Sequence, residues 1–265
     1  MDFLDLQGKA ILVAGVANRR SIAWHAARRL TEAGARVLYL FRDAALLEKN
    51  RLLIGDDAAA FPCNLENDGE LEGMARWVQS QTPQLDGILH CVAYANYSKG
   101  IQPFHRIAKE DFLQAMDISC FSLMKLCQAL EALLAPNASV VTMSISSTRM
   151  AAESYGYMGP VKAALDSTVV FLAKSLTGTV SPGIRVNAVG AGPLKTSASA
   201  GIPGYIDAYL FAEKSTLRHR ALETQEAADT AVFLLSPRSS GINAQTLVVD
   251  AGMACNFFDR ENLRP

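Results

Sequence analysis

Residues 144–162, SISSTRMAAESYGYMGPVK, join two segments whose hydrophobic patterns differ. The run that leads in, residues 138–146, is apolar and rich in β-branched side chains, which predicts a buried strand. The run that leads out, about residues 159–177, follows a helical repeat. A strand that passes through a short connection into a helix is the repeating unit of α/β proteins, so this stretch indicates an α/β fold.

Tyr155 and Lys162 are the chemically active side chains of this stretch. Their spacing is close to two helical turns, which would place both on one face. A lysine there lowers the cost of ionising a nearby phenol, because an opposite charge favours the charged form. A phenol so placed can donate a hydrogen bond to a carbonyl oxygen that becomes negative in a transition state. Taken alone, the pair also fits a rim tyrosine and a solvated lysine on an ordinary helix.

Pro160 modifies this geometry. Proline is tolerated only in the first turn of a helix, so we expect the helix to begin near Gly159. Tyr155 would then lie on the segment that leads into the helix, and the two-turn spacing would be approximate.

The rest of the chain repeats the alternation of strand and helix. Strands are predicted at residues 9–16, 35–41, 58–63, 85–95, 138–146, 184–192 and 245–252, and helices from Ser21 and at residues 68–81, 110–134, 159–177 and 224–235. Near-continuous apolar strands indicate a parallel sheet that is covered on both faces. We therefore predict one doubly wound, Rossmann-type α/β domain over residues 1–265, with a seven-stranded parallel sheet and helices on both faces.

Composition and charge exclude several classes of protein. The chain has 265 residues, is 50% hydrophobic and carries a net charge of −1, which argues against a nucleic-acid surface. Its N-terminus lacks a signal-peptide pattern, and no apolar run is long enough to span a membrane. The 5 cysteines are odd in number and form no C-x-x-C pair, so we expect reduced thiols and a cytoplasmic location. The four histidines show no metal spacing, and His90 is expected to be a core residue.

Residues 15–23, GVANRRSIA, lie where a dinucleotide fold presents backbone N–H groups to a pyrophosphate. The usual G-x-G-x-x-G is absent, but Gly15 permits a turn that is closed to residues with a Cβ atom. Ser21 is suited to cap the next helix or to face a phosphate. A strand–turn–helix without a ligand is the alternative. After the second strand, Arg42 favours the 2′-phosphate of NADP and Asp43 the free ribose of NAD, so the choice stays open with a slight preference for NADPH.

Five stretches occur in an order that carries a family resemblance. They are GVANRRSIAW at residues 15–24, HCVAYAN at 90–96, MDISCFS at 116–122, the Tyr-x6-Lys pair, and RVNAVGAGPLKTSASAGI at 185–202. Together they resemble the enoyl-acyl carrier protein reductases of type II fatty acid synthesis, a divergent branch of the short-chain dehydrogenase/reductases. The resemblance covers about residues 8–254. The Tyr-x6-Lys spacing is its discriminating feature, since most short-chain dehydrogenases use Tyr-x3-Lys.

The resemblance implies hydride transfer from NADH or NADPH to the β-carbon of an enoyl thioester, carried by acyl carrier protein or coenzyme A. Tyr155 would contact the thioester oxygen, Lys162 would hold the nicotinamide ribose, and about residues 194–215 would form a substrate-binding lid. With Arg42 added from the strand end, the expected cofactor-binding residues are Gly15, Ser21, Ile22, Arg42, Asn64, Leu65, Cys91, Val92, Ala93, Lys162, Leu194 and Thr196. The expected substrate-binding residues are Tyr94, Ala95, Ile145, Tyr155, Ala198 and Ile202. A homo-oligomer, a tetramer in most members, is expected to pack through the helices at residues 110–134 and 159–177.

Some positions depart from the family pattern. Ile145 stands where many members carry a second pocket aromatic, and it has no hydroxyl group. Asn64 replaces a common aspartate and Cys91 a common serine. The string SISS also resembles the strand end of ordinary short-chain carbonyl reductases. A keto reductase of a specialised pathway and a non-catalytic nucleotide-binding protein therefore stay as alternatives.

Overall fold

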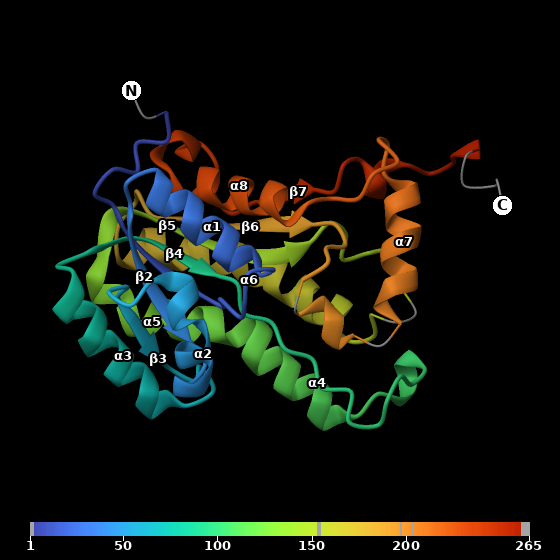
Figure 1. The fold of residues 1–265 in the computed structure, drawn as a ribbon, viewed down its shortest axis with the longest axis horizontal. Helices are drawn as coiled ribbons and strands as arrows, with labels where there is room; N and C mark the ends of the chain where they lie inside the picture. Colours follow the sequence, from blue (N-terminus) through green and yellow to red (C-terminus); the bar gives the residue numbers. More distant parts are fainter. Residues whose placement is uncertain (1–2, 153–154, 197, 203, 261–265) are drawn as a thin grey trace.

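The computed structural model describes residues 3–152, 155–196, 198–202 and 204–260. Its centre is one seven-stranded sheet in the order β3-β2-β1-β4-β5-β6-β7, with every neighbouring pair parallel (Figure 1). The strands are β1 (Ala10–Ala14), β2 (Arg36–Phe41), β3 (Ala60–Pro62), β4 (Leu85–His90), β5 (Leu134–Ile145), β6 (Arg185–Ala191) and β7 (Thr246–Val249). The predicted doubly wound α/β sheet is confirmed.

Helices cover both faces of the sheet. One face packs against α1 (Ile22–Glu32), α2 (Ala44–Ile54) and α8 (Thr224–Leu235). The other packs against α3 (Asp68–Gln81), α5 (Ser122–Leu130) and α6 (Met158–Thr179). Two further helices, α4 (Lys109–Met116) and α7 (Tyr205–Ser215), lie past the carboxyl ends of the strands (Figure 1). Both helices lie at the edge of the sheet where parallel α/β folds bind their ligands.

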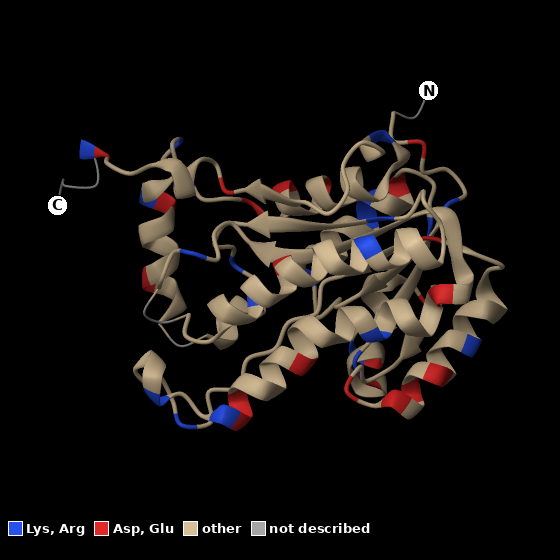
Figure 2. Ribbon diagram, turned by 180° about the vertical axis from the view of Figure 1, so that it is seen from behind, with Lys and Arg blue, Asp and Glu red and all other residues tan. Residues whose placement is uncertain are grey.

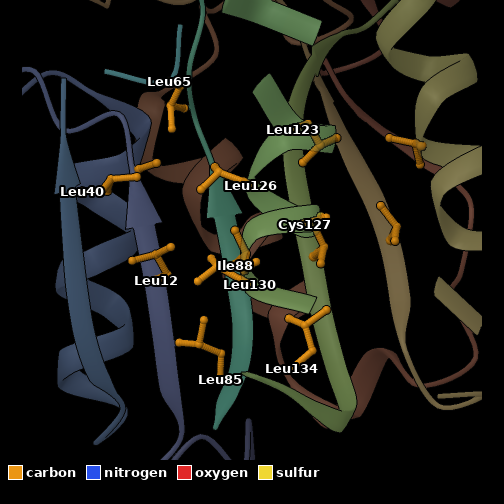
Figure 3. Close-up of a cluster of buried hydrophobic side chains, with 14 of the residues drawn as sticks. Leu12, Leu40, Leu65, Leu85, Ile88, Leu123, Leu126, Cys127, Leu130 and Leu134 are labelled. Carbon is orange, nitrogen blue, oxygen red and sulfur yellow. The ribbon is translucent and has the colours of Figure 1, made fainter. Parts of the chain in front are cut away.

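The apolar runs of the strands are continuous because successive side chains enter different cores. Leu12 and Ile88 face the core that contains Leu123 and Leu126 of α5, which Figure 3 shows together. Ile11, next along the chain, belongs to the core under α1 and α8. Since neighbouring positions of a strand point to opposite faces, a sheet buried on both sides needs apolar residues at every position.

The expected helix over residues 110–134 is interrupted. Helix α4 ends at Met116, a π-helical turn spans Asp117–Phe121, and α5 ends at Leu130. The hydroxyl of Ser122, the first residue of α5, donates to the carbonyl of Ile118 in this turn at 2.6 Å. A π-turn inserts one residue into the helical repeat, and such turns are frequent at functional sites.

Two helices were not predicted from the sequence. Helix α2 follows Asp43, whose carboxylate accepts a hydrogen bond from the Leu46 amide at 2.7 Å and so caps the helix. Helix α7 begins after Gly204, which adopts a φ of 71°. It lies inside residues 194–215, for which we expected a substrate-binding lid and predicted no helix. In the other direction, β4 ends at His90, five residues before the expected limit.

Residues of both charge signs occur throughout the outer part of the fold. Figure 2 shows Lys and Arg interspersed with Asp and Glu along the outer helices. Within the described ranges, none of the helices combines the length and the hydropathy needed to cross a bilayer.

Candidate active site

The site lies where the direction of strand progression reverses, between β1 and β4. Gly15 follows β1 with a φ of +103°, and a Cβ atom on it would lie 2.2 Å from the carbonyl oxygen of Cys91. The Cys91 amide in turn donates to the carbonyl of Ala14 at 3.0 Å. The two strand ends therefore touch through backbone alone, and only glycine fits the first position. In doubly wound sheets this switch point is the place where a dinucleotide binds.

The turn after Gly15 uses its serine internally. Ser21 occupies the N-cap position of α1, as predicted, but its side chain makes no capping hydrogen bond. Its hydroxyl donates to the carbonyl of Asn18 at 2.5 Å and accepts from the Asn18 amide at 3.4 Å. Ile22 is the first residue of α1. The serine thus holds the turn in shape, and the first amides of the helix remain the natural anion donors.

Three expected cofactor residues lie at the ends of β2 and β3. The Arg42 guanidinium is exposed and pairs with the Asp43 carboxylate at 2.9 Å. The pKa of Asp43 is lowered, first by the hydrogen bond from Leu46 and then by Arg42. The amide of Asn64 donates to the Glu70 carboxylate at 2.7 Å, and the next residue, Leu65, is buried. These groups lie farther along the same edge of the sheet than Gly15 and Cys91.

The loop after β4 carries the next group of expected residues. Cys91 and Val92 are half-buried, Ala93 and Tyr94 are exposed, and Ala95 packs against the core. The π-turn fixes this loop through Ser119, whose hydroxyl accepts from the Tyr94 amide at 2.9 Å and donates to the Tyr94 carbonyl at 3.1 Å.

Lys162 is buried at the carboxyl end of β5. The residue lies near the start of α6, and its ammonium group donates to the Met143 carbonyl at 2.6 Å. Burial lowers its pKa to about 8, while Cys91 and Asp166 act in the opposite direction. The ammonium is therefore charged at neutral pH and lies close to the end of β4.

Tyr155 precedes α6 and is not part of it. The helix begins at Met158, so Pro160 lies in its first turn, as the sequence predicts. Burial raises the pKa of the Tyr155 phenol, and Tyr205 and Tyr97 raise it further. Our expectation that Lys162 would favour the ionised phenol is wrong, because desolvation dominates and the lysine is bonded to the strand instead. The phenol stays protonated and keeps its hydrogen for donation.

The segment after β6 is tied together by two hydroxyl groups that sequence reasoning did not single out. The Tyr205 hydroxyl accepts from the Leu194 amide at 2.8 Å and donates to its carbonyl at 3.0 Å. The Ser199 hydroxyl donates to the Leu194 carbonyl at 2.7 Å and accepts from the Thr196 amide at 2.9 Å. The only sequence signal for the role of Tyr205 was a tyrosine in a segment of small residues.

The remaining expected substrate residues border this region. Ile145 ends β5 beside Ala191 of β6, Ala198 is exposed, and Ile202 is half-buried. Ser197 and Pro203, which fall in the expected lid, lie outside the described residues. The structure thus places Ile145, Leu194 and Thr196 at the ends of β5 and β6, next to the strand end that Lys162 contacts.

His90 is a core residue, as predicted. Its ring nitrogens lie 2.8 Å from the Thr142 hydroxyl and 2.8 Å from the Ser122 hydroxyl. Burial, followed by the charge of Lys162, lowers its pKa to about 3, so it is neutral. In the part of the chain that the structure describes, no group of histidine, cysteine and acidic side chains is arranged to hold a metal.

A doubly wound sheet with a glycine turn at its switch point and a tyrosine and lysine after its fifth strand defines a class, the Rossmann-type oxidoreductases. The enoyl-(acyl carrier protein) reductase family model matches residues 15–254. The chain belongs to this family. A relative from Nostoc sp. (strain PCC 7120), named as an NADH-dependent enoyl-acyl carrier protein reductase, is 37% identical over 254 residues, which cover 94% of this chain and 97% of the relative.

Solved structures of the same name resemble the chain throughout. The enoyl-acyl carrier protein reductase (NADH) from Aquifex aeolicus VF5 has a TM-score of 0.90 and 30% identity, with 96% of this chain and 99% of that chain covered. The Bacillus cereus enzyme, solved with NADP+ and indole naphthyridinone, has a TM-score of 0.86 and 33% identity, with 93% and 96% covered.

Replacing Gly15 with alanine should remove nicotinamide binding and destabilise the fold. The new Cβ would overlap the Cys91 carbonyl, and the positive φ adds strain of about 1–2 kcal/mol. Gly55→Ala is the matched control, because Gly55 has a φ of +94° and no atom within 4 Å of the added Cβ. We expect Gly15→Ala to melt several degrees below Gly55→Ala and to lose NADH fluorescence enhancement, which Gly55→Ala retains. Equal melting temperatures and equal binding would contradict the contact.

The affinity for NADH should fall as pH rises through 8. Lys162 loses its charge with a pKa of about 8, whereas His90 at about 3 and Cys91 at about 12 do not titrate nearby. Between pH 7 and pH 9.5 we expect the fluorescence-derived dissociation constant to rise roughly tenfold. Lys162→Met should bind weakly and show no such step. A flat wild-type profile over this range would refute the role of the ammonium group.

Proposed function

We propose that this chain reduces the trans-2 double bond of an enoyl thioester in fatty acid or related acyl-chain biosynthesis, as an NAD(P)H-dependent oxidoreductase. Its membership of the enoyl-acyl carrier protein reductase family supports the reaction class. The observation that carries the assignment of groups is a half-buried Tyr155 and a buried Lys162 that both follow β5, with the Lys162 ammonium held at the carboxyl end of that strand. Burial raises the pKa of the phenol and lowers that of the ammonium, which leaves the first protonated and the second charged at neutral pH. Such a pair is suited to receive negative charge on an oxygen.

The two side chains have separate tasks in this proposal. Reduced nicotinamide, when bound, supplies the hydride for the β-carbon of the enoyl thioester. Tyr155 donates a hydrogen bond to the thioester oxygen, on which negative charge develops. Lys162 holds the nicotinamide ribose and adds positive potential. Because Lys162 is buried and Tyr155 is half-buried, both interactions are stronger than they would be in solution.

The dinucleotide would lie along the carboxyl edge of the sheet. The turn at Gly15 and the first amides of α1 suit a pyrophosphate, because the N–H groups at the start of a helix bind anions. Glycine is required in this turn, since a Cβ atom at Gly15 would overlap the Cys91 carbonyl. The loop after β4, with Cys91, Val92 and Ala93, would follow the cofactor toward Lys162. We propose further contacts from Ser21, Ile22, Asn64, Leu65, Leu194 and Thr196.

The choice between NADH and NADPH stays a prediction with a slight preference for NADPH. Arg42 is exposed, so its guanidinium is available to a 2′-phosphate, although Asp43 shares it at 2.9 Å. The Nostoc and Aquifex proteins are named for NADH, and the Bacillus cereus structure contains NADP+.

The substrate would enter between the loop after β4 and a lid formed by residues 194–215. We propose contacts from Tyr94, Ala95, Ile145, Ala198 and Ile202, with the acyl chain carried by acyl carrier protein or coenzyme A. The Tyr205 and Ser199 bonds hold the base of the lid at Leu194, so movement would be confined to the part beyond it. We also propose a cytoplasmic location, a single domain and no nucleic-acid or membrane partner.

Replacing Tyr155 with phenylalanine or Lys162 with alanine should lower turnover of a crotonyl thioester by on the order of 10²–10³. The lysine variant should also bind NADH or NADPH more weakly. Tyr39→Phe, in the core beneath α1, is the control, because it removes a buried phenol oxygen away from the site. Wild-type turnover in either site variant would defeat the mechanism. Reduction of an acetoacetyl thioester in place of the crotonyl compound would favour the keto reductase.

We propose that the protein is a homo-oligomer, with the tetramer as the expected form. The outer sides of α5 and α6 expose Met124, Val170 and Phe171, the last with 75% of its surface accessible. These side chains exceed what one sheet face can bury, and contiguous apolar surface marks contacts between proteins.

Replacing Phe171 with glutamate should therefore reduce the molecular mass measured by size-exclusion chromatography with light scattering. Placing a charge in an interface core costs several-fold to a hundredfold in affinity. Leu52→Glu is the control, since Leu52 is 92% exposed but lies on α2, away from α5 and α6. If both variants keep the wild-type mass, α6 does not form the interface.

A further inference from the structure

Two buried side-chain hydroxyl groups have no hydrogen-bond partner within the described part of the chain, those of Tyr97 and Ser144. Ser144 lies in β5, next to the carbonyl that Lys162 contacts. Tyr97 lies in the loop after β4. Buried polar groups are nearly always paired, so an unpaired donor calls for an explanation, and a ligand is one of the few available.

The position of Tyr97 is fixed without help from its hydroxyl group. Its ring stacks on Tyr157 with 5.5 Å between the centroids, and Tyr157 in turn donates its hydroxyl to the Asn96 carbonyl. On the other side, the buried Asp111 carboxylate accepts from the Ser98 amide at 3.0 Å and from its hydroxyl at 2.8 Å. Hydrogen bonds thus fix Asn96 and Ser98 on either side of Tyr97, and the Tyr97 hydroxyl itself has no partner in the described part of the chain.

The ring lies beside the proposed catalytic tyrosine. Gly156 directly follows Tyr155, and a Cβ atom on Gly156 would lie 3.9 Å from Cε1 of Tyr97. Gly156 and Tyr97 also line the same pocket, so the backbone next to Tyr155 and the Tyr97 ring border one space. This pocket is also lined by Ile101, Ile107 and Tyr157. Tyr97 therefore lines a pocket that adjoins the segment of Tyr155, and a substrate bound at Tyr155 could extend into it.

The side chain at position 145 cannot donate a hydrogen bond to a substrate, whereas the Tyr97 hydroxyl can. Ile145 ends β5 at the site and offers no hydrogen-bond donor. An enoyl thioester on a pantetheine arm carries its acceptors as carbonyl oxygens, and a phenol is a donor of the right chemistry for them. We infer that the Tyr97 hydroxyl donates a hydrogen bond to a carbonyl oxygen of the bound thioester substrate.

This assignment rests on the proposed reductase function and makes Tyr97 a substrate-binding residue. Because its ring is clamped before substrate arrives, the hydrogen bond costs little ordering of the protein. The contact is made in the ground state as well as in the transition state, so its loss should appear in KM more than in kcat.

The test is Tyr97→Phe, which keeps the stacking on Tyr157 and removes only the oxygen. With a crotonyl thioester we expect KM to rise by roughly three- to tenfold, with kcat within about twofold of wild type. The KM for NADH or NADPH should not change. Tyr39→Phe, which removes a buried phenol oxygen remote from the pocket, should leave all three constants unchanged, and circular dichroism should show both variants folded.

The outcomes separate this inference from the proposed function. A wild-type protein that reduces the thioester, together with a Tyr97→Phe variant of unchanged KM, would overturn the inference and leave the function standing. A fall in kcat at constant KM would also overturn it, because the oxygen would then act only in the transition state. If the wild type reduces no enoyl thioester, both fall together, and Tyr155→Phe would then show no loss either.

Discussion

The hydrogen bond from Lys162 to the Met143 carbonyl ties the reactive helix to the reactive strand. The donor is an ammonium group on a residue with 5% of its surface exposed, and the acceptor is a backbone carbonyl 2.6 Å away in β5. A buried charge without partners is costly, and this carbonyl gives the ammonium group a hydrogen-bond acceptor in place of water. The bond also sets the direction of the side chain, which fixes where positive potential is available at the sheet edge.

The free-energy cost of burying the Lys162 ammonium group follows from the shift of its pKa. A shift from 10.5 to about 8 corresponds to roughly 3 kcal/mol that disfavours the folded, charged state. This penalty is full below pH 8 and is relieved as pH rises from 8 toward 10.5, because the unfolded chain then holds a proton that the folded chain has lost. The two apolar cores on either side of the sheet must supply the stability that offsets it.

The sequence predicted the sheet well because burial on both faces leaves a strong pattern. Seven apolar runs and the helices between them determined the fold class, and the restricted backbone of Pro160 located the start of α6. Helix α2 was missed because Asp43 was interpreted as a ribose ligand, while the structure uses it as a helix cap. The π-turn leaves no signal in composition or periodicity, since its sequence is as helical as its surroundings.

For the site, the sequence identified candidate residues more reliably than it predicted their hydrogen-bond partners. Gly15 was identifiable because a positive φ beside a neighbouring backbone admits only glycine. The hydroxyl of Ser21 was expected to cap a helix or to face a phosphate, but it closes its own turn. The roles of Tyr97 and Tyr205 depend on contacts between segments far apart in the chain, and a loop tyrosine has no local pattern that distinguishes a pocket from a surface.

Burial, rather than the attraction between the two groups, sets the protonation of the proposed catalytic pair. It raises the pKa of Tyr155 and lowers that of Lys162, so each group moves away from its charged form. At neutral pH the phenol keeps its proton and the lysine keeps its charge. A phenol that is so weakly acidic gives up its proton reluctantly, yet it remains a full hydrogen-bond donor. In the proposed reaction Tyr155 would therefore meet the negative oxygen as a protonated hydrogen-bond donor, and Lys162 would contribute through its potential.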